Sequence, residues 1–190
     1  VSALVGYAFA RYSVPGSSQL FGIVVAMLIV PFIVILIPQF IIYARLKLTN
    51  TYWPWILGAL GGTPFYIFMF RQFFLGFPRE LEEAAEVDGC GPFRIFLQIF
   101  LPNAKPVIAT VMIFAIIGVW GDYLTPSIYL SASKTLLGVA LATAFKDPAG
   151  NSMQTVSLAA SVLYIIPLIV VFFFGQKYIL QGVVTSGLKG

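Results

Sequence analysis

Long stretches without a charged side chain constrain this sequence more than any other feature. One of them runs without interruption from Tyr12 to Ala44, and only 9% of the 190 residues are charged, whereas 59% are apolar. Mean hydropathy is +0.95, while soluble domains carry roughly 25% charged residues. A single water-soluble core cannot hide so much apolar surface, and a disordered chain would be more polar. The sequence therefore predicts an all-α, polytopic membrane protein.

Five apolar runs are candidate spans, because about 20 apolar residues are needed to cross roughly 30 Å of hydrocarbon. They cover residues 1–10, 20–43, 53–70, 106–121 and 156–175. Three further segments are not spans, namely 77–103, 127–155 and a small-residue tail over 181–190; an apolar patch at 136–145 predicts a short helix. We expect one domain over 1–190 that is truncated at its N-terminus, because the chain starts without Met inside an apolar run.

Proline and glycine interrupt several of these runs. They are Pro31, Pro38, Gly58, Gly61, Gly62, Pro64 and Pro167. Each proline removes a backbone donor and bends a helix, and the freed carbonyls need partners in neighbouring helices or in water. The pattern fits ordinary packing of membrane helices, and it also fits a conduit whose helices bend to open and close.

The distribution of Lys and Arg predicts the orientation, because cytoplasmic loops hold the excess of positive charge. With the segment 77–103 inside, the cytoplasmic side holds Arg11, Arg71, Arg79, Arg94, Lys105, Lys177 and Lys189, and the outer side holds Arg45, Lys47, Lys134 and Lys146. This bias places the C-terminus in the cytoplasm. It also explains the net charge of +4 better than binding to nucleic acid does.

The composition removes several kinds of chemistry. The chain has no histidine, which excludes Ser-His-Asp and Cys-His nucleophiles and most zinc and haem sites. The single Cys90 cannot form an internal disulfide. No G-x-x-x-x-G-K-[ST] loop is present to cradle phosphates. We therefore expect no catalytic residue, bound metal or cofactor on this chain.

Five of the seven acidic residues lie close together, in a segment that we call the acidic loop (residues 78–102). They are Glu80, Glu82, Glu83, Glu86 and Asp88. Pro78 suits a first helical turn, early acids favour the helix N-terminus, and Gly89 can end the helix. The loop therefore predicts a short helix followed by a sharp turn.

A second helix is predicted to start at Pro92 and to end at Leu101-Pro102. Its apolar positions Phe93, Phe96, Leu97 and Phe100 follow helical spacing and would form one face. In the first helix, Ala84 and Ala85 are small enough for another backbone to approach. The acids around them fit a basic cleft on a partner protein, but they fit a merely solvated loop equally well.

Beyond this physical argument, the motif Glu83-Ala84-Ala85, then Gly89, then Ile99-Phe100-Leu101-Pro102, resembles the EAA motif of ATP-binding-cassette importer permeases. The flanking acids are similar to those of the carbohydrate importer branch. The C-terminal residues Gln176-Lys177-Tyr178, Gln181-Gly182 and Gly187-Leu188-Lys189-Gly190 also resemble that branch. The resemblance covers essentially the whole chain.

The resemblance implies that the acidic loop is a coupling helix that binds a cleft of an ATPase subunit. The implied docking residues are Glu82, Glu83, Ala84, Ala85, Asp88, Gly89, Leu101 and Pro102. Glu83 would bond a basic residue, both alanines would pack on the ATPase, Gly89 would form the turn, and Leu101-Pro102 would set the angle of return to the membrane. Cys90 stands where the family often has Ala.

The C-terminal tail would reach between the two ATPase subunits. The residues implied are Gly182, Gly187, Lys189 and Gly190. A frayed terminus is the alternative for this segment.

The outer end of the fourth run carries Trp120, Asp122 and Tyr123, which are candidates for the solute path. An ionisable group at that depth is often functional, and aromatic rings and carboxylates suit sugars. A simple interface anchor is the alternative, and Gly121, where related permeases commonly carry Asn, weakens any inference about the solute.

As a whole, the resemblance implies one permease subunit of an importer for sugars or polyols in a bacterial or archaeal cytoplasmic membrane. Its partners would be a pair of ATP-hydrolysing subunits that hold the ATP and Mg²⁺, a second permease subunit, an extracytoplasmic solute-binding protein and membrane lipid. Closure of the ATPase pair would push the coupling helices together and rock the bent spans. An ATP-independent channel or secondary carrier, a membrane-embedded enzyme, and an importer of another solute are the alternatives.

Overall fold

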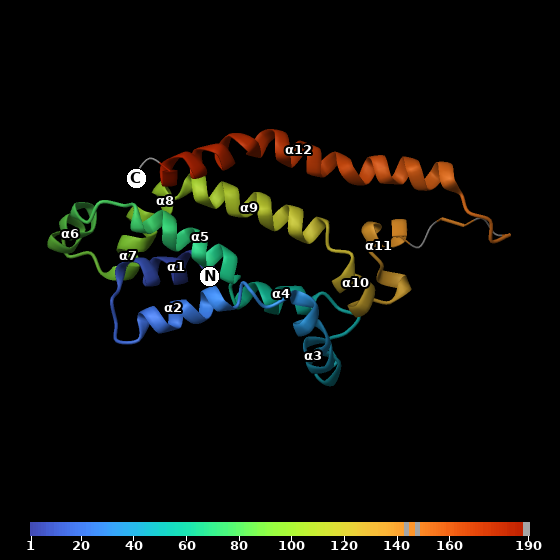
Figure 1. Cartoon of the computed structure of the whole chain (residues 1–190), viewed down its shortest axis with the longest axis horizontal. Helices are drawn as coiled ribbons and strands as arrows, with labels where there is room; N and C mark the ends of the chain where they lie inside the picture. The colour runs from blue at the N-terminus through green and yellow to red at the C-terminus, as the bar shows by residue number, and fades with distance from the viewer. Residues whose placement is uncertain (143–144, 147–148, 188–190) are drawn as a thin grey trace. The chain divides into compact units, whose positions relative to one another are not determined.

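The computed structural model describes residues 1–142, 145–146 and 149–187. These residues form helices joined by turns, with an isolated β-bridge between Lys146 and Ser152 and no strand. Figure 1 shows these helices, coloured from the N-terminus to the C-terminus. They divide into two compact units. The all-α architecture confirms the predicted fold class.

The first unit comprises residues 1–32, 55–111 and the C-terminal residues from 178 onward. Its helices include α1 (Ser2–Arg11), α2 (Ser17–Ala26), α5 (Pro64–Leu75), α6 (Glu80–Val87), α7 (Pro92–Ile95), the π-helical turn η1 (Phe96–Phe100) and α8 (Leu101–Asn103). α1 packs closely on α5 at Gly6. A Cβ atom on Gly6 would lie 2.6 Å from Phe70 Cβ and 3.0 Å from the Arg71 amide nitrogen. A larger residue would therefore push the two helices apart.

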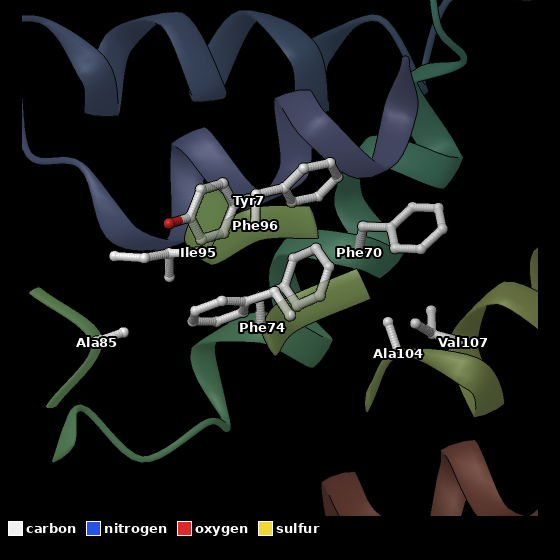
Figure 2. Packing of buried hydrophobic residues seen from close by; sticks show 9 residues of the cluster. Tyr7, Phe70, Phe74, Ala85, Ile95, Phe96, Ala104 and Val107 are labelled. Carbon is white, nitrogen blue, oxygen red and sulfur yellow. The ribbon is translucent and has the colours of Figure 1, made fainter. Parts of the chain in front are cut away.

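Buried aromatic rings form the core of this unit. Tyr7 of α1 lies 4.7 Å from Phe100, and Phe74 of α5 lies 5.5 Å from Phe100, between ring centroids. These separations are typical of favourable aromatic pairs. Figure 2 shows Ala85 at one end of the cluster and Ala104 at the other. Parts of the acidic loop thus belong to the core of the unit.

Two of the predicted spans are broken into shorter helices. The run 20–43 forms α2 and α3 (Phe32–Arg45), which begins directly after Pro31. A proline lacks the amide donor and disfavours helical geometry in the preceding residue, so the prediction of one continuous span was wrong here. The run 53–70 forms α4 (Trp53–Leu60) and α5. Between them, Gly62 adopts a φ of +75°, and Pro64 occupies the first turn of α5.

The second unit comprises residues 33–54 and 112–177. It contains most of α3, the later part of α9 (Lys105–Trp120), α10 (Leu124–Tyr129), η2 (Ala132–Lys134), α11 (Leu137–Ala142) and most of α12 (Gln154–Gly187). α9 confirms the predicted run 106–121, and α11 confirms the short helix predicted within 136–145.

Tyr129 connects α10 to α3 within this second unit. Its hydroxyl donates to Gln39 Oε1 at 3.3 Å, and its ring meets that of Tyr43 edge-on at 5.6 Å. Burial, followed by the nearby Tyr43 and Asp122 groups, raises the pKa of the Tyr129 hydroxyl. The hydroxyl therefore stays protonated and remains a donor at neutral pH.

α12 provides a helix long and apolar enough to cross a membrane, over the 23 residues of Gln154–Gln176. This span agrees with the predicted run 156–175, and the helix itself continues beyond it to Gly187. No proline follows Pro167 to stop it. The segments Pro92–Asn103 and Lys105–Trp120, taken together as one bent span, are also long and apolar enough to cross a membrane.

Candidate functional site

The acidic loop folds as a short helix, a sharp turn and a second helix, as the sequence predicted. α6 is followed by Gly89, whose φ of +77° is a left-handed conformation that glycine adopts without strain. The Cys90 amide donates to the Ala85 carbonyl at 2.9 Å and closes the turn. α7 then begins at Pro92.

Glu82 and Ala85 are the two residues of α6 that face the body of the first unit. The Glu82 side chain is 15% exposed and Ala85 is 7% exposed, whereas every other residue of α6 is exposed. Since successive residues are about 100° apart around a helix, a distinct set of side chains occupies the opposite side. This outward face of α6 consists of Glu80, Glu83, Ala84 and Val87.

The structure gives the two alanines of the motif different surroundings. The resemblance implied that both alanines of the motif pack on an ATPase, but Ala85 packs into the core of its own chain. Its contact partners are internal because it is three residues from the inward-facing Glu82, nearly one helical turn. Glu83 and Ala84 remain on the surface, and so do Asp88 and Gly89 at the tip of the loop.

Arg11, the last residue of α1, contacts the chain just before α6 and the first turn of α6 itself. Its Nε lies 2.9 Å from Glu82 Oε2, and its Nη2 donates to the carbonyl oxygens of Phe77 at 3.2 Å and Pro78 at 3.1 Å. The guanidinium also lies 4.9 Å from the centre of the Phe100 ring. Within the described residues the Nε–H has no aligned hydrogen-bond acceptor, so its contact with Glu82 is an ion pair without a directed hydrogen bond.

A cleft of about 450 Å³ opens beside α6 in the first unit. Its charged lining is balanced between three arginines and three glutamates: Arg11, Arg71, Arg79, Glu82, Glu83 and Glu86. Arg71 is held there by a hydrogen bond from its Nε to the Phe9 carbonyl at 3.2 Å, and it stacks over Phe21 at 4.0 Å. Glu83 and Glu86 therefore line this cleft and are also exposed to solvent.

The second helix of the acidic loop buries only some of the apolar residues that were predicted to share one face. Phe96 and Phe100 are buried, but Phe93 is 61% exposed and Leu97 is 43% exposed. The predicted face assumed α-helical spacing, whereas residues 96–100 form a π-helical turn, which holds more residues per turn. The change in spacing brings Ile95 to the core. The predicted apolar face was therefore wrong at Phe93 and Leu97.

Leu101 and Pro102 lie in α8, immediately before a sharp change of direction. The helical segment Pro92–Asn103 and the segment Lys105–Trp120 make an angle of 78°. Ala104 lies at the bend and is fully buried. The predicted change of direction at this place is confirmed, although the chain remains helical for one residue beyond Pro102.

In the second unit, Trp120 and Asp122 each have a partner within the chain. The Trp120 indole Nε1 donates to the Tyr164 carbonyl at 3.0 Å. Asp122 Oδ1 accepts from the Thr125 amide at 3.0 Å, and so helps to cap α10. Tyr123 is 47% exposed. A role for Trp120, Asp122 and Tyr123 in a solute path stays a prediction.

The C-terminal residues with a predicted ATPase contact fall into two groups. The backbone at Gly182 and Gly187 belongs to α12. Lys189 and Gly190 lie outside the described residues. Their contact with an ATPase also stays a prediction.

Sequence reasoning missed three residues that the structure places at this site: Tyr7, Arg11 and Val87. The Tyr7 hydroxyl donates to Glu82 Oε1 at 3.4 Å, but no local pattern connects residues 75 positions apart. Arg11 stood out only as the first charge after an apolar run. Val87 is 88% exposed, and a helical projection of α6 would have found it once the inward side was known.

Residues 2–185 match the family described as binding-protein-dependent transport system inner membrane components. The chain belongs to this family. Integral membrane subunits of importers make up this class, and they are not enzymes.

Curated relatives and a solved structure agree with this assignment. The chain is 37% identical to the arabinooligosaccharides transport system permease protein AraQ of Halalkalibacterium halodurans, over 100% of this chain and 67% of that protein. It is 32% identical to the maltodextrin transport system permease protein MdxG of Bacillus subtilis, over 100% and 69%. The chain spans about two thirds of the length of such relatives.

A crystal structure of a bacterial ABC transporter involved in the import of the acidic polysaccharide alginate has a similar fold. The TM-score is 0.76 at 25% identity, and the match covers 93% of this chain and 69% of that chain.

Proposed function

We propose that this chain is a permease subunit of an ATP-driven importer, and that α6 is the element through which the ATPase acts on it. The observation that carries the proposal is the outward face of α6. This face combines acidic side chains with one small and one apolar residue, and each of its four residues is exposed.

The chemistry of this face fits a protein partner with a basic cleft. Glu83 can form a charge-assisted bond to an arginine or lysine of the ATPase. Ala84 leaves room for close approach, and Val87 supplies an apolar contact that is 88% exposed in this chain. The left-handed turn at Gly89 keeps Asp88 at the tip of the loop, where it adds negative charge. Glu82 lies on the opposite side of α6, where its ion pair with Arg11 holds the helix to the unit.

The partners in this proposal are a pair of ATP-hydrolysing subunits, a second permease subunit and an extracytoplasmic solute-binding protein. ATP and Mg²⁺ are bound by the ATPase pair, and this chain supplies no cofactor ligand. The membrane is the cytoplasmic membrane of a bacterium or archaeon, and the acidic loop and C-terminus face the cytoplasm. The residues of the C-terminal tail, from Gly182 to Gly190, are a second contact with the ATPase pair.

The solute in this proposal is a sugar or a polyol. The names of the relatives support it, since they describe permeases for arabinooligosaccharides and for maltodextrin. The aromatic and carboxylate groups at Trp120, Asp122 and Tyr123 are of the kind that sugars require, and in this proposal they form one section of the solute path at the end of α9.

Charge reversal at Glu83 tests the docking role. Glu83→Lys should abolish transport and co-purification of the ATPase, while the permease still inserts in the membrane. Glu86→Lys is the matched control, because it makes the same charge change on the flank of α6, and it should retain most of the ATPase. Equal loss in both variants, or normal transport by Glu83→Lys with the ATPase unchanged, would contradict the proposal. Wild-type transport without any ATPase would indicate an ATP-independent carrier instead.

A further inference from the structure

We propose that Arg11 is a positioning residue that fixes the acidic loop to α1, so that a displacement of α6 is passed directly to the first helix. This inference rests on the proposed function, because it concerns how the force from an ATPase would enter the permease. Arg11 lies outside the EAA-like motif.

The contacts of Arg11 gather both helices of the loop at one point. Nη2 bonds the carbonyls of Phe77 and Pro78 just before α6, Nε pairs with Glu82 within α6, and the guanidinium covers the Phe100 ring near the end of the second helix. One side chain of α1 therefore touches the start, the middle and the end of the loop.

The environment of Arg11 makes this attachment specific. The side chains of Arg11 and Glu82 are 5% and 15% exposed, so the loss of either partner leaves a charge in a poorly solvated place. The two carbonyls accept hydrogen bonds from a single guanidinium nitrogen. A lysine could keep the charge but has no planar fork to serve the carbonyls and the carboxylate together.

Besides the Arg11 contacts, α6 is held by one long hydrogen bond, from the Tyr7 hydroxyl to Glu82 Oε1 at 3.4 Å. Its second inward residue, Ala85, offers only a methyl group to the core, and all its remaining side chains are exposed. Without the Arg11 contacts, α6 should therefore lift away from α1 more often, even when its outward face is intact. A partner bound to that face would then move α6 without moving α1.

Cys90 provides a direct readout of this attachment. It is the only cysteine of the chain, it is half-buried, and it packs against the core cluster at the end of α6. The rate at which N-ethylmaleimide modifies Cys90, measured on the assembled transporter in membranes and followed on this chain by mass spectrometry, reports how often α6 detaches.

Arg11→Gln should increase the labelling rate about tenfold or more. Arg94→Gln removes a charge from an exposed position of the same loop and should label at the wild-type rate. The double variant Arg11→Glu with Glu82→Arg restores opposite charges and should label more slowly than Arg11→Glu alone. If Arg11→Gln fails to insert, Arg11→Lys replaces it and should give an intermediate rate. Wild-type labelling in Arg11→Gln or Arg11→Lys, or no rescue in the double variant, would overturn the inference.

A second measurement separates positioning from a general loss of structure. With the solute-binding protein and a mixture of short maltodextrins and arabinooligosaccharides as the probe, Arg11→Lys should hydrolyse more ATP per solute imported than the wild type, while it binds the same amount of ATPase. An unchanged ratio would count against positioning. Failure of the proposed function has a different signature: no ATPase co-purifies with the wild type, whatever the labelling of Cys90.

Discussion

Ala84 and Ala85 are adjacent in the motif, and we predict that the same substitution affects them in opposite ways. Ala85 is 7% exposed and packs against the aromatic core of the first unit. Leucine at this position adds three carbon atoms where no space exists, and such overpacking costs about 1–3 kcal/mol. Ala84 is exposed, and a surface substitution there should change stability by less than about 0.5 kcal/mol.

Thermal unfolding of the purified permease measures the first difference. For a chain of this size each kcal/mol shifts Tm by roughly 2–4 °C. Ala85→Leu should therefore lower Tm by about 2–12 °C, while Ala84→Leu leaves Tm near the wild-type value. Co-purification of the ATPase below the Tm of both variants measures the second difference: Ala84→Leu should lose the ATPase, because the added side chain blocks close approach, and Ala85→Leu should retain more of it.

Either of two results would refute the predicted difference between Ala84 and Ala85. Equal Tm values for Ala84→Leu and Ala85→Leu would mean that α6 does not turn Ala85 toward the core. Loss of the ATPase in Ala85→Leu alone, with wild-type Tm, would mean that Ala85 and not Ala84 meets the partner.

Further predictions concern the outward face, the turn and the core. Val87→Glu should leave Tm unchanged and weaken ATPase co-purification, because it adds a third acid to the outward face and removes its apolar contact; retention of the ATPase would exclude Val87 from the contact. Gly89→Ala should cost about 1–2 kcal/mol through backbone strain alone, since space around the Cβ is open, and chemical unfolding would measure it. Phe100→Ala should cost about 3–5 kcal/mol, against less than about 0.5 kcal/mol for the exposed control Phe93→Ala, and similar losses in both would argue against the buried position of Phe100.

The sequence was sufficient for features that depend on neighbouring residues. Gly89 and Pro92 predicted the turn of the acidic loop because their backbone preferences act locally. The apolar run 106–121 predicted α9 almost to the residue. Where one local signal was set against another, the prediction failed: the apolar run 20–43 suggested one helix, but Pro31 separates α2 from α3.

Features that depend on tertiary contacts could not be predicted in the same way. The ion pair between Arg11 and Glu82 joins residues 71 positions apart, and no periodicity encodes it. Ala85 faces inward on the same side of α6 as Glu82. The burial of Ile95 depends on the π-helical turn after it, which has no simple compositional signal. The short helix and the turn of the acidic loop could therefore be located in the sequence, but the side of α6 that faces solvent required the structure.

The 78° bend at Ala104 has a mechanical consequence. The arm Pro92–Asn103 is about 18 Å long at 1.5 Å per residue, so a rotation of about 10° around the bend would shift its far end by about 3 Å. Phe96 and Phe100 are embedded among rings from α1 and α5, which prevents the arm from swinging alone. Because the backbones of α1 and α5 approach too closely at Gly6 to slide freely, any such swing must carry both helices with it as a single lever.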